Sequence, residues 1–477
     1  MKPNTRPGYN KWFESIQRNP FKLIPECLLI NPPDLNSRYP YLGIATLASM
    51  LRQHDISVSI LDCSALSMEI DETVSYIRQV NPRIIGLTVM SPNLQRVYRL
   101  IKRIQHEIPN AVLVVGGAHI DADPESIKDL EVKYGFWGEC EHEFLAFCQA
   151  ILAGEPPPPM PGFIHYIDNC LIVGEKRIVS DLDELPPPAY DLLPIERYYS
   201  PSTSSRTISF ICSRGCPYNC LFCSKLHQKP YRFLGTSNIL NQLRYLVKEL
   251  KIEWVEFVDE IFTLKRSLIV ELCQAIIDDD LIFEWGCGTR ADRVDEELLR
   301  LMKRAGCRKI GFGVESGVES VRYRINKKVS DLKILDAISL CRSIQIKTQT
   351  CFIFGHPCET LAEMRQTVHF ARNLGSNYPS FGRMIPIPGS ELFELAKLNG
   401  EIDPDIWRRF MHGDSELPIY TPKGVSPEDV NHIFQTAWFS VYFWPRNLWI
   451  NRDIFLSWQY FQRAGKAFWD FACSRGF

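Results

Sequence analysis

The sequence of 477 residues lacks a long apolar run, a secretory signal and an excess of charge of one sign. Its N-terminus has no apolar core of the type that marks a signal peptide. No stretch approaches the roughly 18 apolar residues of a membrane-spanning helix. The formal net charge is -2, which implies no general attraction to nucleic acid. With 45% hydrophobic and 23% charged residues, the composition is that of a globular protein of roughly three domains.

Cysteine is plentiful, with 16 residues, but its distribution argues against disulfide bonds. The cysteines are scattered through apolar segments, as reduced thiols are, and do not form the dense framework of a small secreted protein. We therefore expect a cytoplasmic protein with reduced thiols and no transmembrane segment.

One group of cysteines is closely spaced, because Cys216, Cys220 and Cys223 follow the pattern C-x3-C-x2-C. A register that starts at Cys212 is excluded, since the position that would need a cysteine is Asn219. Thiolates at short spacings are the ligands of iron–sulfur clusters. Three of them can hold three irons of a [4Fe-4S] cluster and leave the fourth iron open to a small ligand. These cysteines are the candidate metal ligands.

A zinc site and chance clustering would also account for the motif. A structural zinc site has four ligands, usually as two separated pairs. His227 is a candidate fourth ligand, but no second C-x-x-C pair follows. Among 16 cysteines some clustering arises by chance. The flanking residues Arg214, Gly215 and Pro217 favour the cluster.

Residues 26–150 alternate short β-branched runs with stretches of helical periodicity. This alternation predicts an α/β domain, Rossmann-like, with a doubly wound parallel sheet. Ligands of such sheets bind outside the carboxyl ends of the strands, so the residues that follow each strand are the ones of interest. The expected strands are 27–31, 57–62, 84–89, 111–115 and 132–136, and helical spacing runs over 97–108.

Two Pro-rich stretches then predict an extended linker at 155–200, because runs of proline favour semi-rigid spacers. The alternative is a surface loop inside one domain. From 207 to about 390 strands and helices alternate again, which predicts a partial (β/α)6 barrel with its active site at the carboxyl ends of the strands. The cysteine motif directly follows the first strand. The expected strands are 207–212, 254–258, 283–287, 309–314, 348–354 and 381–385.

The C-terminal region is unusually aromatic, with aromatic residues far above the 12% average of the chain. We expect two or three helices there, broken at Pro445. The domain plan is therefore an N-terminal extension 1–25, a Rossmann-like domain 26–154, the linker 155–200, the barrel 201–400 and a helical region 401–477.

The cysteine loop resembles that of the radical S-adenosylmethionine (SAM) enzymes, in which SAM chelates the open iron. Segments 257–263, 311–317 and 354–360 resemble the SAM-binding segments of these enzymes, in the same order and each at a strand end. They imply contacts with the SAM amino group, with its methionyl and ribose groups, and with adenine. One departure is Cys358, which replaces the usual second glycine. Arg290 is the candidate partner of the SAM carboxylate. The SAM-binding residues implied are Tyr218, Phe222, Asp259, Glu260, Arg290, Glu315, Ser316, Gly355 and Pro357.

Residues 28–144 and 182–194 resemble the cobalamin-binding domain and linker of one radical SAM subfamily. The D-x-H-x-x-G segment that supplies an axial His in other cobalamin proteins is absent, so the resemblance implies base-off cobalamin with no His on cobalt. The alternative is a degenerate domain that binds nothing or another nucleotide, although no G-x-G-x-x-G opens a helix here. The cobalamin-binding residues implied are Tyr41, Gly43, Thr88, Ser91, Gly116, Gly117, His119, Gly138 and Glu139.

This resemblance, to class B methylases and anaerobic cyclases with a cobalamin (B12)-binding domain, implies reductive cleavage of SAM and functionalisation of an unactivated C–H bond. C-methylation of a lipophilic small molecule is the first hypothesis, and radical cyclisation or rearrangement is the second. A hypothesis of another class is a non-catalytic metal-cluster scaffold that binds a partner through its aromatic tail. A reductant such as flavodoxin or ferredoxin is expected, and nucleic acid is not.

The aromatic tail suggests a further hypothesis about the substrate. Trp and Tyr favour membrane interfaces, and Arg446, Arg452, Arg463 and Lys466 give the tail a basic edge that suits anionic headgroups. A substrate such as a polycyclic terpenoid or a tetrapyrrole, taken at a membrane surface, would fit. The alternative is that the tail helices only pack over the barrel and close its open side.

Overall fold

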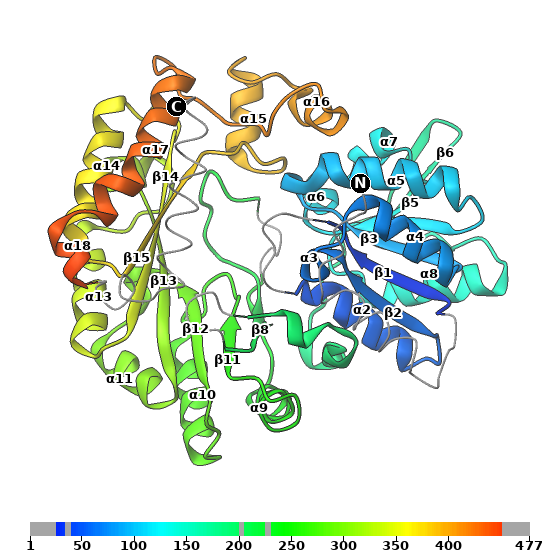
Figure 1. The fold of residues 1–477 in the computed structure, drawn as a ribbon, viewed down its shortest axis with the longest axis horizontal. Helices are drawn as coiled ribbons and strands as arrows, with labels where there is room; N and C mark the ends of the chain where they lie inside the picture. The colour runs from blue at the N-terminus through cyan, green and yellow to red at the C-terminus, as the bar shows by residue number, and fades with distance from the viewer. Residues whose placement is uncertain (1–24, 34–39, 200–204, 225–229, 451–477) are drawn as a thin grey trace, which may run out of the picture. The chain divides into compact units, whose positions relative to one another are not determined.

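The computed structural model describes residues 25–33, 40–199, 205–224 and 230–450. The chain divides into two compact units, the first made of residues 1–199 and 404–418 and the second of residues 200–403 and 419–477 (Figure 1). The chain therefore passes from one unit to the other three times.

The first unit is built on a seven-stranded sheet with the order β2-β1-β3-β4-β5-β6-β7. The first five strands pair in parallel, which confirms the doubly wound sheet, and β6 and β7 extend it in antiparallel fashion. The strands are β1 (Cys27–Asn31), β2 (Val58–Asp62), β3 (Ile84–Thr88), β4 (Val112–Gly116), β5 (Tyr134–Phe136), β6 (Phe163–Ile167) and β7 (Cys170–Val173).

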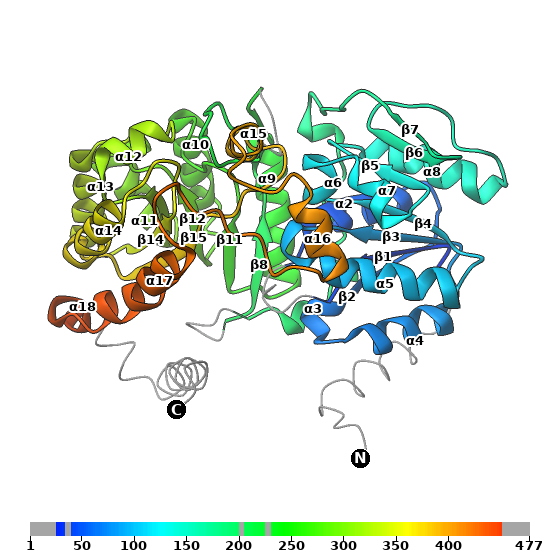
Figure 2. The same cartoon turned by 90° about the horizontal axis from the view of Figure 1, so that it is seen from above.

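Helices cover both faces of this sheet, with α2 packed beside α8 and α4 beside α5 (Figure 2). The predicted helical spacing is realised in α5, whose apolar residues are buried and whose last predicted position, Ile108, caps the helix. The helices are α2 (Leu42–Arg52), α3 (Cys63–Leu66), α4 (Ile70–Val80), α5 (Leu94–Glu107), α6 (Ala118–Ala122), α7 (Ser126–Leu130), α8 (Glu141–Ala153) and, from beyond the barrel, α16 (Ile406–His412).

The range expected to be an extended linker differs from that expectation. Its first part forms the β6–β7 hairpin, and its remainder is bonded to the first unit. Val179 donates its N–H to a Glu139 carboxylate oxygen at 2.9 Å, and the Tyr198 hydroxyl donates to Asp62 at 2.6 Å. Phe163 and Ile164 are buried, and this apolar burial holds the hairpin to the sheet although prolines precede it.

The second unit is a six-stranded parallel sheet with the order β15-β14-β13-β12-β11-β8. Its two edge strands do not pair with each other, so the barrel is open, as predicted. The strands are β8 (Thr207–Phe210), β11 (Trp254–Phe257), β12 (Glu284–Thr289), β13 (Cys307–Glu315), β14 (Lys347–Phe354) and β15 (Tyr378–Arg383). The helices between them are α9 (Thr236–Arg244), α10 (Arg266–Asp278), α11 (Glu296–Arg304), α12 (Glu319–Arg324), α13 (Asp331–Ser343) and α14 (Leu361–Leu374).

Three further helices follow in this unit, α15 (Glu391–Leu398), α17 (Pro427–Tyr442) and α18 (Pro445–Ile450). The predicted break at Pro445 separates α17 from α18. Helix α17 packs against α14 and β15, with the Trp438 ring 5.6 Å from that of Phe381. Within the described ranges no helix combines the length and apolar character that a bilayer crossing demands. The aromatic residues after position 450 lie outside the described residues.

Candidate active site

The candidate SAM-binding residues of the second unit gather at one edge of its sheet. The cysteine loop follows β8, Asp259 and Glu260 follow β11, and Arg290 follows β12. Glu315 ends β13 and Gly355 follows β14. Because the strands are parallel, these segments share the carboxyl edge, where (β/α) proteins place their chemistry.

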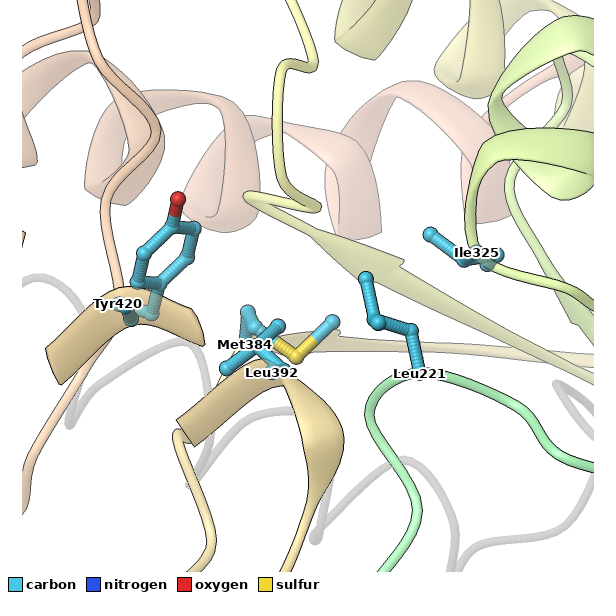
Figure 3. Close-up of a cluster of buried hydrophobic side chains, with 6 residues drawn as sticks. Leu221, Ile325, Met384, Leu392 and Tyr420 are labelled. Atoms are coloured by element: carbon cyan, nitrogen blue, oxygen red, sulfur yellow. The ribbon is translucent and has the colours of Figure 1, made fainter. Parts of the chain in front are cut away.

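Leu221, an apolar residue with no chemical role, fixes the position of the cysteine loop. Its N–H donates to the Ile325 carbonyl at 3.1 Å, and its own carbonyl accepts the N–H of Leu392 at 2.9 Å. Its side chain is buried in a cluster with Ile325, Met384, Leu392 and Tyr420 (Figure 3). Cys220 is therefore positioned by the packing of segments from several parts of the unit.

The three cysteines of the motif are accessible to different degrees, since Cys216 and Cys220 are half-buried and Cys223 is exposed. Burial is the main cause that raises the pKa of Cys216 and of Cys220, and the nearby Cys223 raises both further. Lys327 opposes this effect and favours the thiolates. Cys212 is fully buried at the strand end, as expected for a cysteine outside the motif.

Among the described residues, no three His, Cys, Asp or Glu side chains converge on a point that would hold one metal ion. A [4Fe-4S] cluster places each cysteine on a different iron, so the three sulfurs can lie apart. His227, the candidate fourth zinc ligand, lies outside the described residues.

Arg290 is held by several contacts, but one nitrogen of its guanidinium has no hydrogen-bond partner in the described part of the chain. Its guanidinium lies over the Tyr218 ring, 3.8 Å from the ring centroid, and it pairs with Asp292 at 2.9 Å. It also donates to the Lys327 carbonyl at 2.9 Å, while its Nη1 has no hydrogen-bond partner among the described residues. Arg293 in turn donates to the Tyr218 hydroxyl at 2.8 Å. A buried guanidinium with a free N–H suits an anionic group such as a carboxylate.

A buried ion pair lies beside this arginine, formed by Glu315 and Lys327 at 2.9 Å. Gly313 makes room for it, because a Cβ there would lie 2.5 Å from a Glu315 carboxylate oxygen and 2.8 Å from the Lys327 amine. Burial disfavours the charged amine, but the attraction of Glu315 outweighs burial and the pKa of Lys327 is raised. Sequence reasoning missed Lys327, because it follows α12 and belongs to no strand-end motif.

Asp259 and Ser316, two further candidate SAM residues, are also hydrogen-bonded within the fold. Asp259 accepts from the Cys212 N–H at 3.1 Å and from the Ser213 hydroxyl, and burial raises its pKa to about 7. The Ser316 hydroxyl is fully buried and lies 3.1 Å from that of Thr367. Glu260, next to Asp259, is exposed.

The turn after β14 forms despite its departure from the family pattern. Cys358 adopts the left-handed conformation that a glycine would take there, with φ 59°. Glu359 stabilises the turn, because one carboxylate oxygen accepts the N–H groups of Gly355 at 2.9 Å and His356 at 3.0 Å. The His356 ring lies 6.0 Å from that of Phe222 in the cysteine loop. Pro357, between His356 and Cys358, is partly buried.

In the first unit, the candidate cobalamin residues after β3 and β4 form one connected structure. Gly117 has φ 96°, and a Cβ there would lie 2.5 Å from the Thr88 hydroxyl. Val89 donates to the carbonyl of Gly116, at 2.7 Å, and the Ser91 hydroxyl lies 2.9 Å from Nδ1 of His119. The close approach of these two loops therefore requires glycine at position 117.

The remaining candidate cobalamin residues are placed less uniformly. Gly138 donates to Asp121 at 2.6 Å, and the Glu139 carboxylate is occupied by the N–H of Val179. Tyr41 precedes the first turn of α2, in which a Cβ on Gly43 would have no atom of the described residues within 4 Å. The loops after β3 and β4 are thus joined to each other, while the start of α2 leaves room beside it.

Comparison with known proteins finds two family models that match parts of the chain. A B12 binding domain matches residues 34–147, and the radical SAM superfamily matches residues 210–371. The chain thus carries a region similar to a B12 binding domain, followed by a region similar to the radical SAM superfamily. Both matches were expected from the cysteine loop and from the first sheet.

Individual relatives agree with this placement. An uncharacterized methyltransferase of Pyrococcus horikoshii is 29% identical over 90% of this chain and 94% of the relative. The anaerobic magnesium-protoporphyrin IX monomethyl ester cyclase of Rubrivivax gelatinosus is 24% identical over 76% of this chain and 67% of the relative. The structure of the radical SAM methyltransferase TsrM of Kitasatospora setae, with cobalamin and a [4Fe-4S] cluster bound, has the same fold, with a TM-score of 0.70 at 17% identity over 88% of both chains.

Replacing Leu221 with Ala should lower both stability and iron binding. A buried Leu→Ala change costs about 2–5 kcal/mol, and here it also frees the loop that carries Cys220. We expect a lower melting temperature and less iron per chain after anaerobic reconstitution. The control is Leu395→Ala on α15, where the side chain is 42% exposed. Equal iron content and equal melting of the two variants would contradict the role of Leu221.

Glu359 should make stability fall as the pH rises. Burial raises its pKa from 4.5 to about 7, so the folded state favours the protonated carboxyl. Its contribution is fully present below pH 4.5 and is lost as the pH rises through 7. Over that window we expect the wild type to lose up to about 3 kcal/mol relative to Glu359→Gln. If the melting temperatures of the wild type and of Glu359→Gln changed with pH in parallel, the raised pKa of Glu359 would be contradicted.

Proposed function

We propose that the chain is a cobalamin-dependent radical SAM enzyme that methylates an unactivated carbon of a small molecule. The observation that carries the proposal is the cysteine loop. Its three thiols have C-x3-C-x2-C spacing and lie on a loop fixed by Leu221, and Cys223 is near enough to the other two to raise their pKa. The names of the Pyrococcus horikoshii relative and of the Kitasatospora setae structure support methylation in particular.

The cofactors carry the difficult chemistry: when bound, the cluster and SAM supply a radical that removes hydrogen from carbon, and cobalamin supplies a methyl carrier. The chain's residues bind and orient them. Cys216, Cys220 and Cys223 hold the cluster, and the free N–H of Arg290 binds the SAM carboxylate. Lys327 places a positive charge next to the thiolates and neutralises part of their charge.

In the first unit, the loops after β3 and β4 and the turn at Gly138 form the cobalamin site. The fit rests on Gly117, because its missing Cβ lets the loops after β3 and β4 meet at one end of the sheet. His119 is fully buried and is held by Ser91, so its ring is not presented as a ligand to cobalt. These loops would hold a base-off cobalamin without His119 as a ligand to cobalt, and the group would supply a methyl carrier.

Cyclisation or rearrangement is the second candidate reaction, and the named cyclase relative of Rubrivivax gelatinosus supports it. The two reactions differ in product mass, because methylation adds one carbon and cyclisation does not. The non-catalytic scaffold predicts a metal site without SAM cleavage. We also expect a small electron carrier such as flavodoxin or ferredoxin as reductant, and a cytoplasmic location.

A lipophilic substrate is supported by the part of the aromatic tail that the structure describes. Trp449 at the end of α18 is 71% exposed and Phe443 is 59% exposed, which leaves apolar surface for a lipid or substrate. Trp444 is covered by the Arg372 guanidinium, 4.5 Å from its ring centroid. The tail thus both packs on the barrel and exposes aromatic rings, which suits a peripheral membrane contact.

The cysteines give the direct test of the radical SAM assignment. Replacing Cys216, Cys220 or Cys223 with Ala should abolish the visible absorption of the reconstituted cluster and the formation of 5′-deoxyadenosine from SAM and dithionite. Cys212→Ala is the matched control and should retain both, because this thiol is buried away from the motif. Cluster loss in Cys212→Ala with retention in Cys216→Ala would show that the register is wrong.

The spectrum of the bound corrinoid tests the cobalamin assignment. The protein reconstituted with hydroxocobalamin and then reduced should give a cobalt(II) EPR signal without nitrogen superhyperfine splitting. His119→Ala should leave that line shape unchanged. Splitting that disappears in His119→Ala would place this histidine on cobalt and overturn the base-off, His-off assignment. Failure to bind any corrinoid would reject the role of the first unit.

A further inference from the structure

A helix from beyond the barrel completes the first unit. Residues 404–418 leave the second unit, join the first and then return. Their helix α16 packs on α5, with the His412 ring 4.8 Å from that of Tyr98 and Arg408 3.3 Å from Asp129. The inner face of α16 is apolar and covered, since Trp407, Phe410 and Met411 are buried. The sequence pattern places this segment in the helical C-terminal region and gives no sign of its position.

The helix brings Trp407 against a candidate cobalamin residue. The indole lies 5.9 Å from the His119 ring, centroid to centroid. His119 is 0% exposed, and it joins two loops: its N–H donates to the Val89 carbonyl at 2.9 Å, and its Nδ1 lies 2.9 Å from the Ser91 hydroxyl. The loops after β3 and β4 are therefore joined here by a backbone hydrogen bond of His119 and, in addition, by its imidazole, which makes the link to Ser91.

The Trp407 indole lies near an imidazole that makes a single hydrogen bond through its ring. Nε2 of His119 has no hydrogen-bond partner among the described residues, so no polar contact on that side fixes the ring. Burial alone lowers the pKa of His119 to about 4 and keeps it neutral. A neutral ring with one hydrogen bond keeps its position by packing, and a large aromatic neighbour supplies that packing.

We infer that Trp407 is a positioning residue of the corrinoid site, which acts through His119 to hold the two loops that receive the ligand. The inference rests on the proposed binding of cobalamin to the first unit. Loss of the indole admits water to Nε2, lets the imidazole turn, and frees Ser91 from it. The corrinoid site is then assembled from two parts of the chain separated by the whole radical SAM barrel.

A double-mutant cycle tests this inference with the full-length protein. Wild type, Trp407→Ala, His119→Ala and the double variant are titrated with hydroxocobalamin, and bound ligand is measured by absorbance after ultrafiltration. We expect Trp407→Ala to weaken binding about tenfold and Trp407→Phe, which keeps an aromatic ring, to weaken it less than threefold. In the His119→Ala background, Trp407→Ala should add less than twofold, because residues that act through one contact are not additive.

Arg408→Ala is the matched control, since it loosens the docking of α16 at an exposed ion pair without touching His119. The affinity of this variant for hydroxocobalamin should be within twofold of that of the wild type. Full binding by Trp407→Ala, multiplicative effects in the cycle, or an equal loss in Arg408→Ala would overturn the inference. If Trp407→Ala does not fold, Trp407→Leu takes its place in the cycle, and the same binding results support or overturn the inference. Absence of binding by the wild type would instead reject the proposed function, and the role of Trp407 with it.

Discussion

Parallel strand pairing is the constraint on which both units depend. A parallel ladder brings the carboxyl ends of strands from distant parts of the sequence to one edge. In the second unit this edge collects the cysteine loop, Arg290, Glu315 and the turn at Gly355. In the first unit it collects the loops at Ser91 and His119. Hydrogen bonds, some local and some to segments distant in the sequence, then hold each loop in its final shape.

At a few positions, these hydrogen bonds go together with an unusual backbone conformation. Gly117 takes a positive φ where two loops approach, and Cys358 and Glu315 take left-handed conformations that cost more for residues with a Cβ. Such strain persists where the surroundings determine the conformation. Glu359 fixes the turn at Cys358 through two N–H groups, and Lys327 fixes Glu315 through an ion pair. At the candidate site, Glu315 and Cys358 are thus each held in their left-handed conformation by a named partner.

The sequence predicts most strands of both sheets and the place of the cysteine loop, because hydrophobic periodicity and short motifs are local signals. Prediction from the sequence fails where contacts between residues distant in the sequence determine the structure. The β6–β7 hairpin follows prolines and is recognised only through the burial of Phe163 and Ile164 on the sheet. The role of Lys327 is visible only from its ion pair with Glu315, and that of Trp407 only from its contact with His119. Ser316 matches a motif, yet its hydroxyl contacts Thr367, which a pattern along the chain cannot reveal.

The insertion of α16 into the first unit has a consequence for the order of synthesis. The ribosome completes residues 1–199 long before it reaches residue 404. At about 5–20 residues per second, roughly 200 intervening residues leave the surface of α5 that α16 covers open for about 10–40 s. The first sheet can form during this interval, but its final helix arrives only with the completed barrel. A nascent chain released too early would carry that surface uncovered, as a place where a chaperone or a second chain could bind.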